Sequence, residues 1–145
     1  MKTQRVHYFC LCLFLGLLSQ CKAPVPGPDL TRNWKASEVK EGTVIVYREG
    51  SLSNIYPGYS QFQMAFQQNS VTYTEFTGDT FTGTWELTNN NQNLTFRGLT
   101  PEPYGTEGLI EFTLLKWSTN QLVIRRNTLN PKTGDQVNEY TLIPK

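Results

Sequence analysis

The chain has 145 residues, of which 17% are charged and 12% are aromatic, and its formal net charge is +1. This length accommodates one domain, or one domain and a targeting segment. The near balance of charge excludes a strongly basic nucleic-acid-binding protein, and the aromatic content excludes a disordered chain. We therefore expect a folded domain with no nucleic-acid partner.

The first 20 residues have the composition of a secretory signal peptide. Lys2 and Arg5 precede an uncharged apolar run of 11 residues, 8–18. A membrane-spanning helix needs about 20 apolar residues, so this run is too short to span. A positive start followed by a short apolar run is typical of a secretory signal. We predict that residues 1–20 are removed.

The end of this segment resembles a bacterial lipobox. Residues 18–21 read Leu-Ser-Gln-Cys, and in such a motif the cysteine, here Cys21, is acylated and becomes the first residue. The alternative is an ordinary signal peptide followed by a chance cysteine. Several acyl chains, such as palmitate, anchor a protein stably. Because Lys22 stands where an aspartate retains enterobacterial lipoproteins at the inner membrane, the resemblance implies an outer-membrane lipoprotein of the cell envelope.

Removal of residues 1–20 leaves a chain without histidine. His7, Cys10 and Cys12 all lie in the removed segment, and Cys21 is the only cysteine that remains. Cys-His and Ser-His-Asp catalysis, zinc sites built on histidine or cysteine, and an intramolecular disulfide are thereby excluded. Nucleotide-binding glycine motifs and EF-hand loops are absent as well. We expect neither enzymatic activity nor a cofactor or metal.

Residues 21–29 form a predicted proline-rich tether. Three prolines within residues 23–29 preclude a helix and an interior strand. The segment is either a stiff spacer of about 3 Å per residue or a disordered terminus. Both interpretations place the folded domain at residues 30–145.

Residues 30–145 alternate between apolar and polar side chains with a period of two. In residues 61–67, for example, Phe62, Met64 and Phe66 share one face and the glutamines share the other. The expected strands are a first one near Trp34, then 43–48, 61–67, 70–74, 81–87, one around Leu94 and Phe96, 109–117, 121–127 and 137–143.

This pattern predicts an all-β fold. Thr, Val and aromatic residues dominate the periodic segments, and turn residues recur every eight to twelve positions. Short connections favour an antiparallel up-and-down barrel of about eight or nine strands, whose closure removes exposed edges. The alternative is a β-sandwich.

The domain is similar to the small lipocalin-like lipoproteins of Bacteroidetes. The resemblance lies in residues 30–35, 62–66, 81–85, 94–96 and 140–142. It implies a lipocalin-like barrel displayed in the periplasm or on the cell surface. In lipocalins an arginine packs over the tryptophan of the opening strand, so the resemblance also implies a cation–π pair between Arg126 and Trp34; the alternative is an exposed arginine at a strand end.

A barrel of this size is filled by side chains or holds one small ligand. The large inward-facing residues are either core or the lining of a partial cavity for a small hydrophobic ligand. A filled barrel would instead indicate a protein-interaction or envelope-assembly module, and in both cases we expect a monomer. The candidate ligand-binding residues are Phe62, Met64, Phe66, Tyr73, Phe81, Trp85, Phe96, Phe112 and Tyr140.

The alternation breaks at Leu114 and Leu115. Either a β-bulge re-aims the strand there, or Leu115, Trp117 and Val123 form an outer apolar patch that marks a partner surface. We favour the bulge, because it requires no partner.

Two loops carry tyrosines. Tyr56 and Tyr59 lie in residues 49–60, and Tyr104 lies in residues 100–108. They are either contact groups for a ligand or lids that fold back over the barrel. Glu102 and Glu107 in the second loop allow a calcium site or a carboxylate pair, but we expect them to be solvated.

Overall fold

The computed structural model of the protein describes residues 26–145. The predicted signal peptide and Cys21 lie outside the described residues, as does the first part of the tether. The strands are β1 (Asn33–Glu41), β2 (Val44–Arg48), β3 (Gln63–Phe66), β4 (Ser70–Thr74), β5 (Thr80–Thr88), β6 (Asn93–Thr100), β7 (Ile110–Ser118), β8 (Gln121–Arg126) and β9 (Asn138–Pro144). Two short 3-10 helices, η1 (Pro57–Gln61) and η2 (Pro131–Thr133), complete the secondary structure of this part of the chain.

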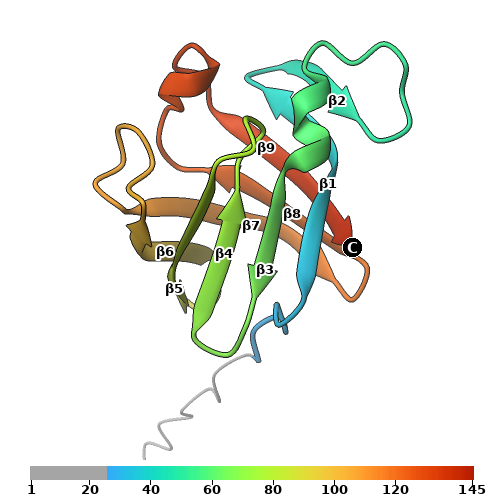
Figure 1. Ribbon diagram of the computed structural model, residues 1–145. Helices are drawn as coiled ribbons and strands as arrows, with labels where there is room; N and C mark the ends of the chain where they lie inside the picture. Colours follow the sequence, from blue (N-terminus) through green and yellow to red (C-terminus); the bar gives the residue numbers. More distant parts are fainter. Residues whose placement is uncertain (1–25) are drawn as a thin grey trace, which may run out of the picture.

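The strands form a closed antiparallel barrel, so the predicted all-β barrel is confirmed. Eight strands run in the order β1-β3-β4-β5-β6-β7-β8-β9, and β9 pairs with β1 to close the ring (Figure 1). This closure excludes the sandwich. Among residues 26–145, no helix is long and apolar enough to cross a membrane.

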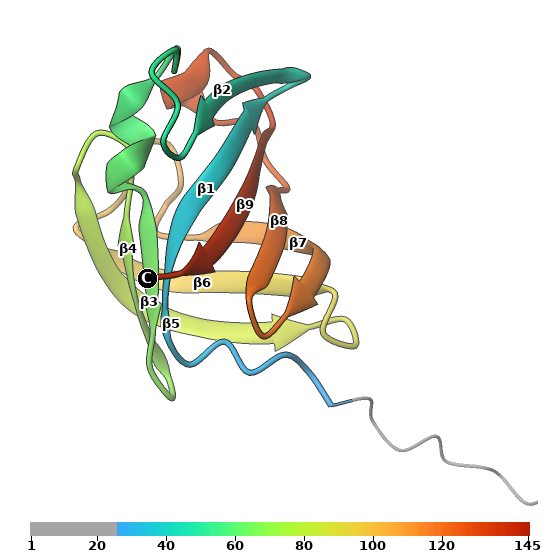
Figure 2. The same ribbon diagram turned by 90° about the vertical axis from the view of Figure 1, so that its right-hand side faces the viewer.

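The ninth strand, β2, is an addition to the barrel. It pairs with the upper part of β1, from Glu38 to Glu41, whereas β3 pairs with the lower part of the same edge, from Asn33 to Lys35. β2 and β3 therefore run in the same direction, and η1 lies between them beside the upper end of the barrel (Figures 1 and 2). We call "upper" the end that carries η1 and η2, and "lower" the end at which the chain enters β1.

The side chains at alternate positions of the strands point into the barrel and fill its interior. The buried core takes residues from every strand except β2 at alternate positions, and Val46 and Tyr47 of β2 join it from the side. Burying apolar area at about 25 cal/mol per Å² is the main source of stability for such a core. The predicted inward face of β3, with Met64 and Phe66, is confirmed.

The predicted bulge is confirmed in β7. The pairing of β7 with β8 shifts between Leu114 and Lys116, which leaves Leu115 unpaired and places Trp117 opposite the buried Leu122. The strand has by then reached the lower rim, so Leu115 and Trp117 remain 41% exposed each.

A second shift of register, in β5, explains why position 83 is a glycine. The register of β5 against β6 changes between Thr82 and Thr84, and a Cβ atom on Gly83 would lie 2.5 Å from the Arg97 carbonyl oxygen. Only glycine allows the two backbones to approach this closely.

Candidate ligand site at the upper end of the barrel

The predicted ligand-binding residues lie together, packed against one another. Phe62 stacks on Tyr140 with ring centroids 4.3 Å apart, and Phe96 lies 5.3 Å from Phe112 and 5.8 Å from Tyr73. Such distances are those of rings in direct contact. Eight of the nine residues are buried; the exception is Trp85, which is partly buried near the lower end and donates from Nε1 to the Gln67 carbonyl oxygen at 2.8 Å.

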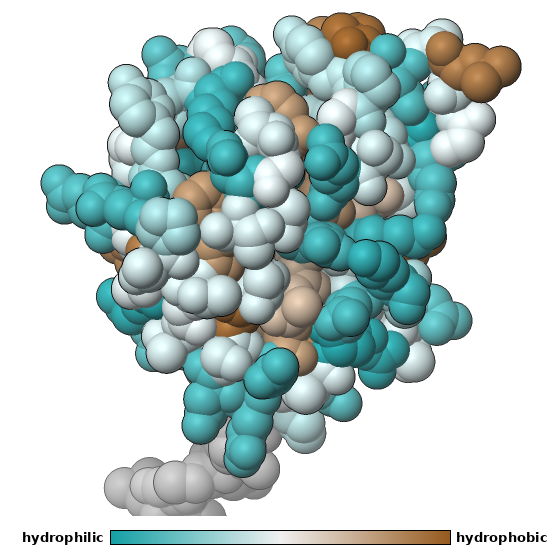
Figure 3. Space-filling view, viewed as in Figure 1, coloured by the Kyte–Doolittle hydropathy of each residue, from teal (hydrophilic) through white to brown (hydrophobic). Residues whose placement is uncertain are grey.

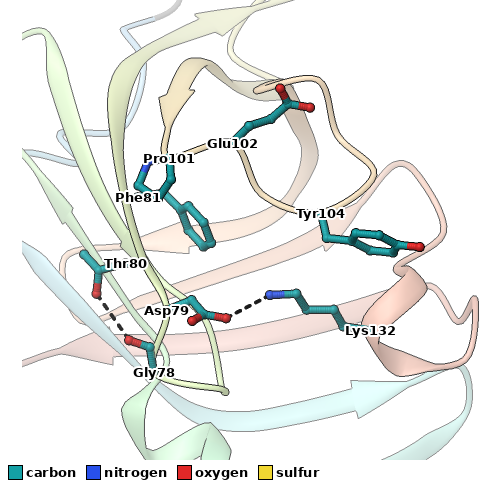
Figure 4. A pocket seen from close by; sticks show the side chains of 8 residues that line it. All are labelled: Gly78, Asp79, Thr80, Phe81, Pro101, Glu102, Tyr104 and Lys132. Carbon is teal, nitrogen blue, oxygen red and sulfur yellow. Dashed lines mark hydrogen bonds and ion pairs between the residues drawn. The ribbon is translucent and has the colours of Figure 1, made fainter.

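An open cleft of about 560 Å³ lies at the upper end. It is bounded by the β4–β5 turn, the β6–β7 loop and η2, which come from three separate regions of the sequence (Figure 4). Phe81 is the one member of the predicted set that lines it. The other lining residues are Gly78, Asp79, Thr80, Pro101, Glu102, Tyr104 and Lys132.

The cleft has an apolar and a polar side. Phe81 presents its ring to the cleft while remaining buried, and Pro101 lies beside it. Tyr104 is 73% exposed at the tip of the β6–β7 loop. Lys132 and Asp79 face them from the opposite wall (Figure 4). The lining thus combines apolar surface with the three charged side chains of Asp79, Glu102 and Lys132.

Lys132 connects two of the three segments that surround the cleft, η2 and the β4–β5 turn. Its ammonium group donates to Glu75 Oε2 at 2.5 Å and to Asp79 Oδ2 at 3.1 Å, and lies 5.8 Å from the centre of the Phe81 ring. Asn130 accepts a hydrogen bond from the Lys132 backbone at 3.1 Å and thereby orients the first turn of η2. The ion pairs therefore hold η2 against the β4–β5 turn.

The pKa values of Lys132 and Asp79 follow from the geometry of these ion pairs. Burial by itself lowers the pKa of Lys132, but hydrogen bonds and charges from Glu75 and Asp79 outweigh it and raise that pKa above its usual value. Hydrogen bonds from Thr77 and Lys132 lower the pKa of the Asp79 carboxyl. Both groups are thus charged at neutral pH.

Tyr59 acts as a lid, whereas Tyr56 and Tyr104 are exposed. Tyr59 is fully buried at the upper end, where its hydroxyl donates to Glu41 Oε1 at 2.7 Å and accepts from Asn138 Nδ2 at 3.2 Å. Burial raises the pKa of the Glu41 carboxyl, and the hydrogen bond from Tyr59 partly offsets this. Of the loop tyrosines, Tyr59 is therefore the one that folds back over the barrel, whereas Tyr56 and Tyr104 do not.

The predicted cation–π pair between Arg126 and Trp34 is wrong. Trp34 lies at the lower end, where Arg32 is 5.5 Å from the centre of its ring. Arg126 lies at the upper end of β8, which runs in the same direction as β1, so the two residues are at opposite ends of the barrel. Arg126 is 97% buried there, opposite Phe112, and its Nε donates to Thr128 Oγ1 at 3.4 Å.

Sequence reasoning missed Lys132, Glu75 and Asp79. Lys132 is separated from its two partners by 57 and 53 positions, and no periodicity links such residues. A signal existed for Glu75, because it continues the inward positions of Val71 and Tyr73.

The acidic residues of the β6–β7 loop make no metal site. Glu102 and Glu107 are both exposed, and within residues 26–145 no three acidic side chains gather as ligands for a metal ion.

Comparison with known proteins supports the fold alone. No protein-family model matches the chain, and no curated protein matches it. A solved structure of a lipocalin-like protein from Bacteroides uniformis aligns with 81% of this chain and all of its own, at 17% identity and a TM-score of 0.50. An uncharacterized protein from Bacteroides eggerthii aligns over the same shares, at 15% identity and a TM-score of 0.46. The fold is therefore lipocalin-like.

Proposed function

We propose that this protein is a lipid-anchored lipoprotein of the bacterial cell envelope, held in the outer membrane through Cys21, and that its upper cleft binds a small hydrophobic ligand with a polar group. The observation that carries the binding role is the cleft of about 560 Å³ lined by Phe81, Tyr104 and Lys132. This volume lies within the range of small-molecule sites.

The rings inside the barrel favour the cleft over the interior as the place of binding. Phe62, Tyr73, Phe96 and Tyr140 occupy the barrel interior and contact one another at 4.3–5.8 Å. A ligand at the upper end would rest on Phe81, the upper edge of this aromatic core. Its polar group would lie toward Lys132 and Asp79.

Tyr104→Ala is expected to weaken ligand binding about two- to tenfold, the range that corresponds to 0.5–1.5 kcal/mol for one aromatic contact. The probe is N-phenyl-1-naphthylamine, an apolar dye that fluoresces when it leaves water, titrated into the purified protein. Tyr56→Ala is the matched control, because Tyr56 is also an exposed tyrosine at the upper end but does not line this cleft. Equal affinities of the two variants would contradict the assignment of the cleft.

Cys21→Ala is expected to abolish acylation and to release the protein from the membrane fraction. Metabolic labelling with an alkyne fatty acid, followed by fractionation of cells, measures both effects. The controls are Cys10→Ala and Cys12→Ala, which change cysteines that the predicted cleavage removes. Unchanged labelling of the Cys21→Ala protein would rule out the anchor.

A second candidate function is that of a protein-binding accessory module. Val44, Leu52, Ile55 and Tyr56 are exposed on β2 and the loop that follows it, and hydrophobic atoms project at this end of the molecule (Figure 3). Native mass spectrometry of the protein extracted from its own membranes separates the candidates. A bound small molecule supports the ligand site, whereas a stoichiometric polypeptide supports the accessory module.

A further inference from the structure

The chain enters the barrel at a fixed point on the lower rim. Leu30 is buried, and its carbonyl oxygen accepts a hydrogen bond from Trp34 Nε1 at 3.2 Å. Arg32 Nη1 donates to the Thr119 carbonyl oxygen in the β7–β8 turn at 2.8 Å. The start of the domain is therefore tied to the lower end of the β7–β8 hairpin.

This point lies beside an exposed tryptophan. A groove of about 280 Å³ at the lower end is lined by Pro28 and Asp29 of the tether, by Arg32, and by Trp117, Ser118 and Thr119 of the hairpin. Figure 2 shows the incoming chain passing beneath the ends of the strands at this side. The tether and Trp117 thus share one surface.

The last four residues of β7, from Leu115 to Ser118, are exposed. Leu115 and Trp117 are 41% exposed because the bulge moves the strand out of register as it passes the lower rim, and Lys116 between them is exposed as well. Within the described part of the chain, Trp117 is the most exposed of the three tryptophans, since Trp34 is buried and Trp85 is partly buried.

The sequence limits how far this surface can lie from the proposed anchor. Cys21 precedes Pro26 by five positions. A fully extended chain spans at most about 3.6 Å per residue, so this segment reaches no more than about 18 Å. An acylated Cys21 would therefore keep the lower end of the barrel close to the headgroups of the bilayer.

We propose that the lower end of the barrel docks on the lipid surface, with Trp117 and Leu115 in the interfacial region and Lys116 at the headgroups. Tryptophan is enriched at this depth because its ring is apolar and its N–H is polar, and lysine is attracted by anionic lipids. The proposal rests on the lipid anchor at Cys21 proposed above. It orients the barrel so that the cleft at the opposite end faces away from the membrane and stays open to ligand.

The experiment supplies the anchor chemically, so that its result does not depend on acylation in cells. All strands and the whole core lie within residues 30–145, and Cys21 is the sole thiol of the chain from residue 21 onward. The protein from Cys21 onward is coupled through this thiol to a maleimide phospholipid. The vesicles contain phosphatidylethanolamine with a minor fraction of phosphatidylglycerol. Quenching of tryptophan fluorescence by brominated phospholipids then reports contact with the bilayer.

We expect quenching in the unmodified sequence and in Trp85→Phe, the matched control, and loss of most of it in Trp117→Phe. Trp117→Tyr, which keeps an interfacial ring, serves as a second variant, and the emission of the buried Trp34 verifies the fold. Equal quenching in Trp117→Phe and the unmodified sequence would overturn the proposal. Self-association of the protein in solution without vesicles, accompanied by a shift in the Trp117 emission, would also overturn the proposal. Absence of acyl labelling at Cys21 in cells would refute the anchor separately.

Discussion

Tyr59→Ala is expected to lower the free energy of unfolding by about 3–5 kcal/mol, the usual loss for a large buried aromatic side chain. The Tyr59 ring stacks on Phe76 at 4.8 Å and contacts Phe62 at 6.2 Å. No other side chain of η1 is buried, so the deletion leaves a cavity and detaches the lid. Urea unfolding followed by circular dichroism measures the change.

Tyr59→Phe separates the contribution of the hydroxyl group to stability from that of the ring. It keeps the packing but removes the donor to Glu41, and we expect a loss of about 1.5–3 kcal/mol because a buried carboxylate loses its partner. Tyr56→Phe, three positions earlier on an exposed residue, is the control and should change stability little. If Tyr59→Ala and Tyr56→Phe had the same unfolding midpoint, η1 would not be held by Tyr59.

Stability is expected to fall steeply above pH 10. Burial raises the pKa values of Tyr59, Tyr73 and Tyr140 well above that of an exposed tyrosine. In the unfolded chain these groups lose their protons near pH 10, whereas in the folded protein they retain them. The unfolded state then binds up to three fewer protons. The free energy of unfolding therefore decreases by about 1.4 kcal/mol per pH unit for each tyrosine, or about 4 for all three.

This contribution is complete below pH 10 and is lost as the pH rises beyond it. The raised pKa of Lys132 acts in the same direction. Urea midpoints measured from pH 9 to 12, with tyrosinate absorbance as a second signal, test the slope. Tyr140→Phe is the control, since it should reduce the slope by about one third. Midpoints independent of pH over this interval would show that these tyrosines ionise in the folded protein.

The strands were predictable because their signal is local. Residues 70–74 form β4 as expected, and the expected strand at 81–87 is β5 with one residue added at each end. Alternation identifies the inward face of a strand from its own residues, because successive side chains point to opposite faces. The bulge at Leu115 was predictable for the same reason, as a break in that alternation.

The positions of residues along the barrel axis were harder to predict from the sequence. Alternation assigns a face but not an end, and the sequence did not reveal that β2 and β3 share one edge of β1. The pair between Arg126 and Trp34, which the resemblance to lipocalins implies, does not form because the two residues lie at opposite ends of the barrel. Likewise, the cleft combines Phe81, a predicted residue, with Lys132, which comes from a loop without a periodic pattern.

By itself the sequence determined the all-β class, the strands and the inward faces, because these depend on the order of apolar and polar residues over five to nine positions. Only the tertiary structure decided that the aromatic residues pack against one another and that Tyr59 closes the upper end. It alone also brought Lys132 to Glu75 and Asp79. These features depend on contacts between residues of different strands and loops, or on the volume that side chains leave unfilled. Neither is set by the spacing of residues along the chain.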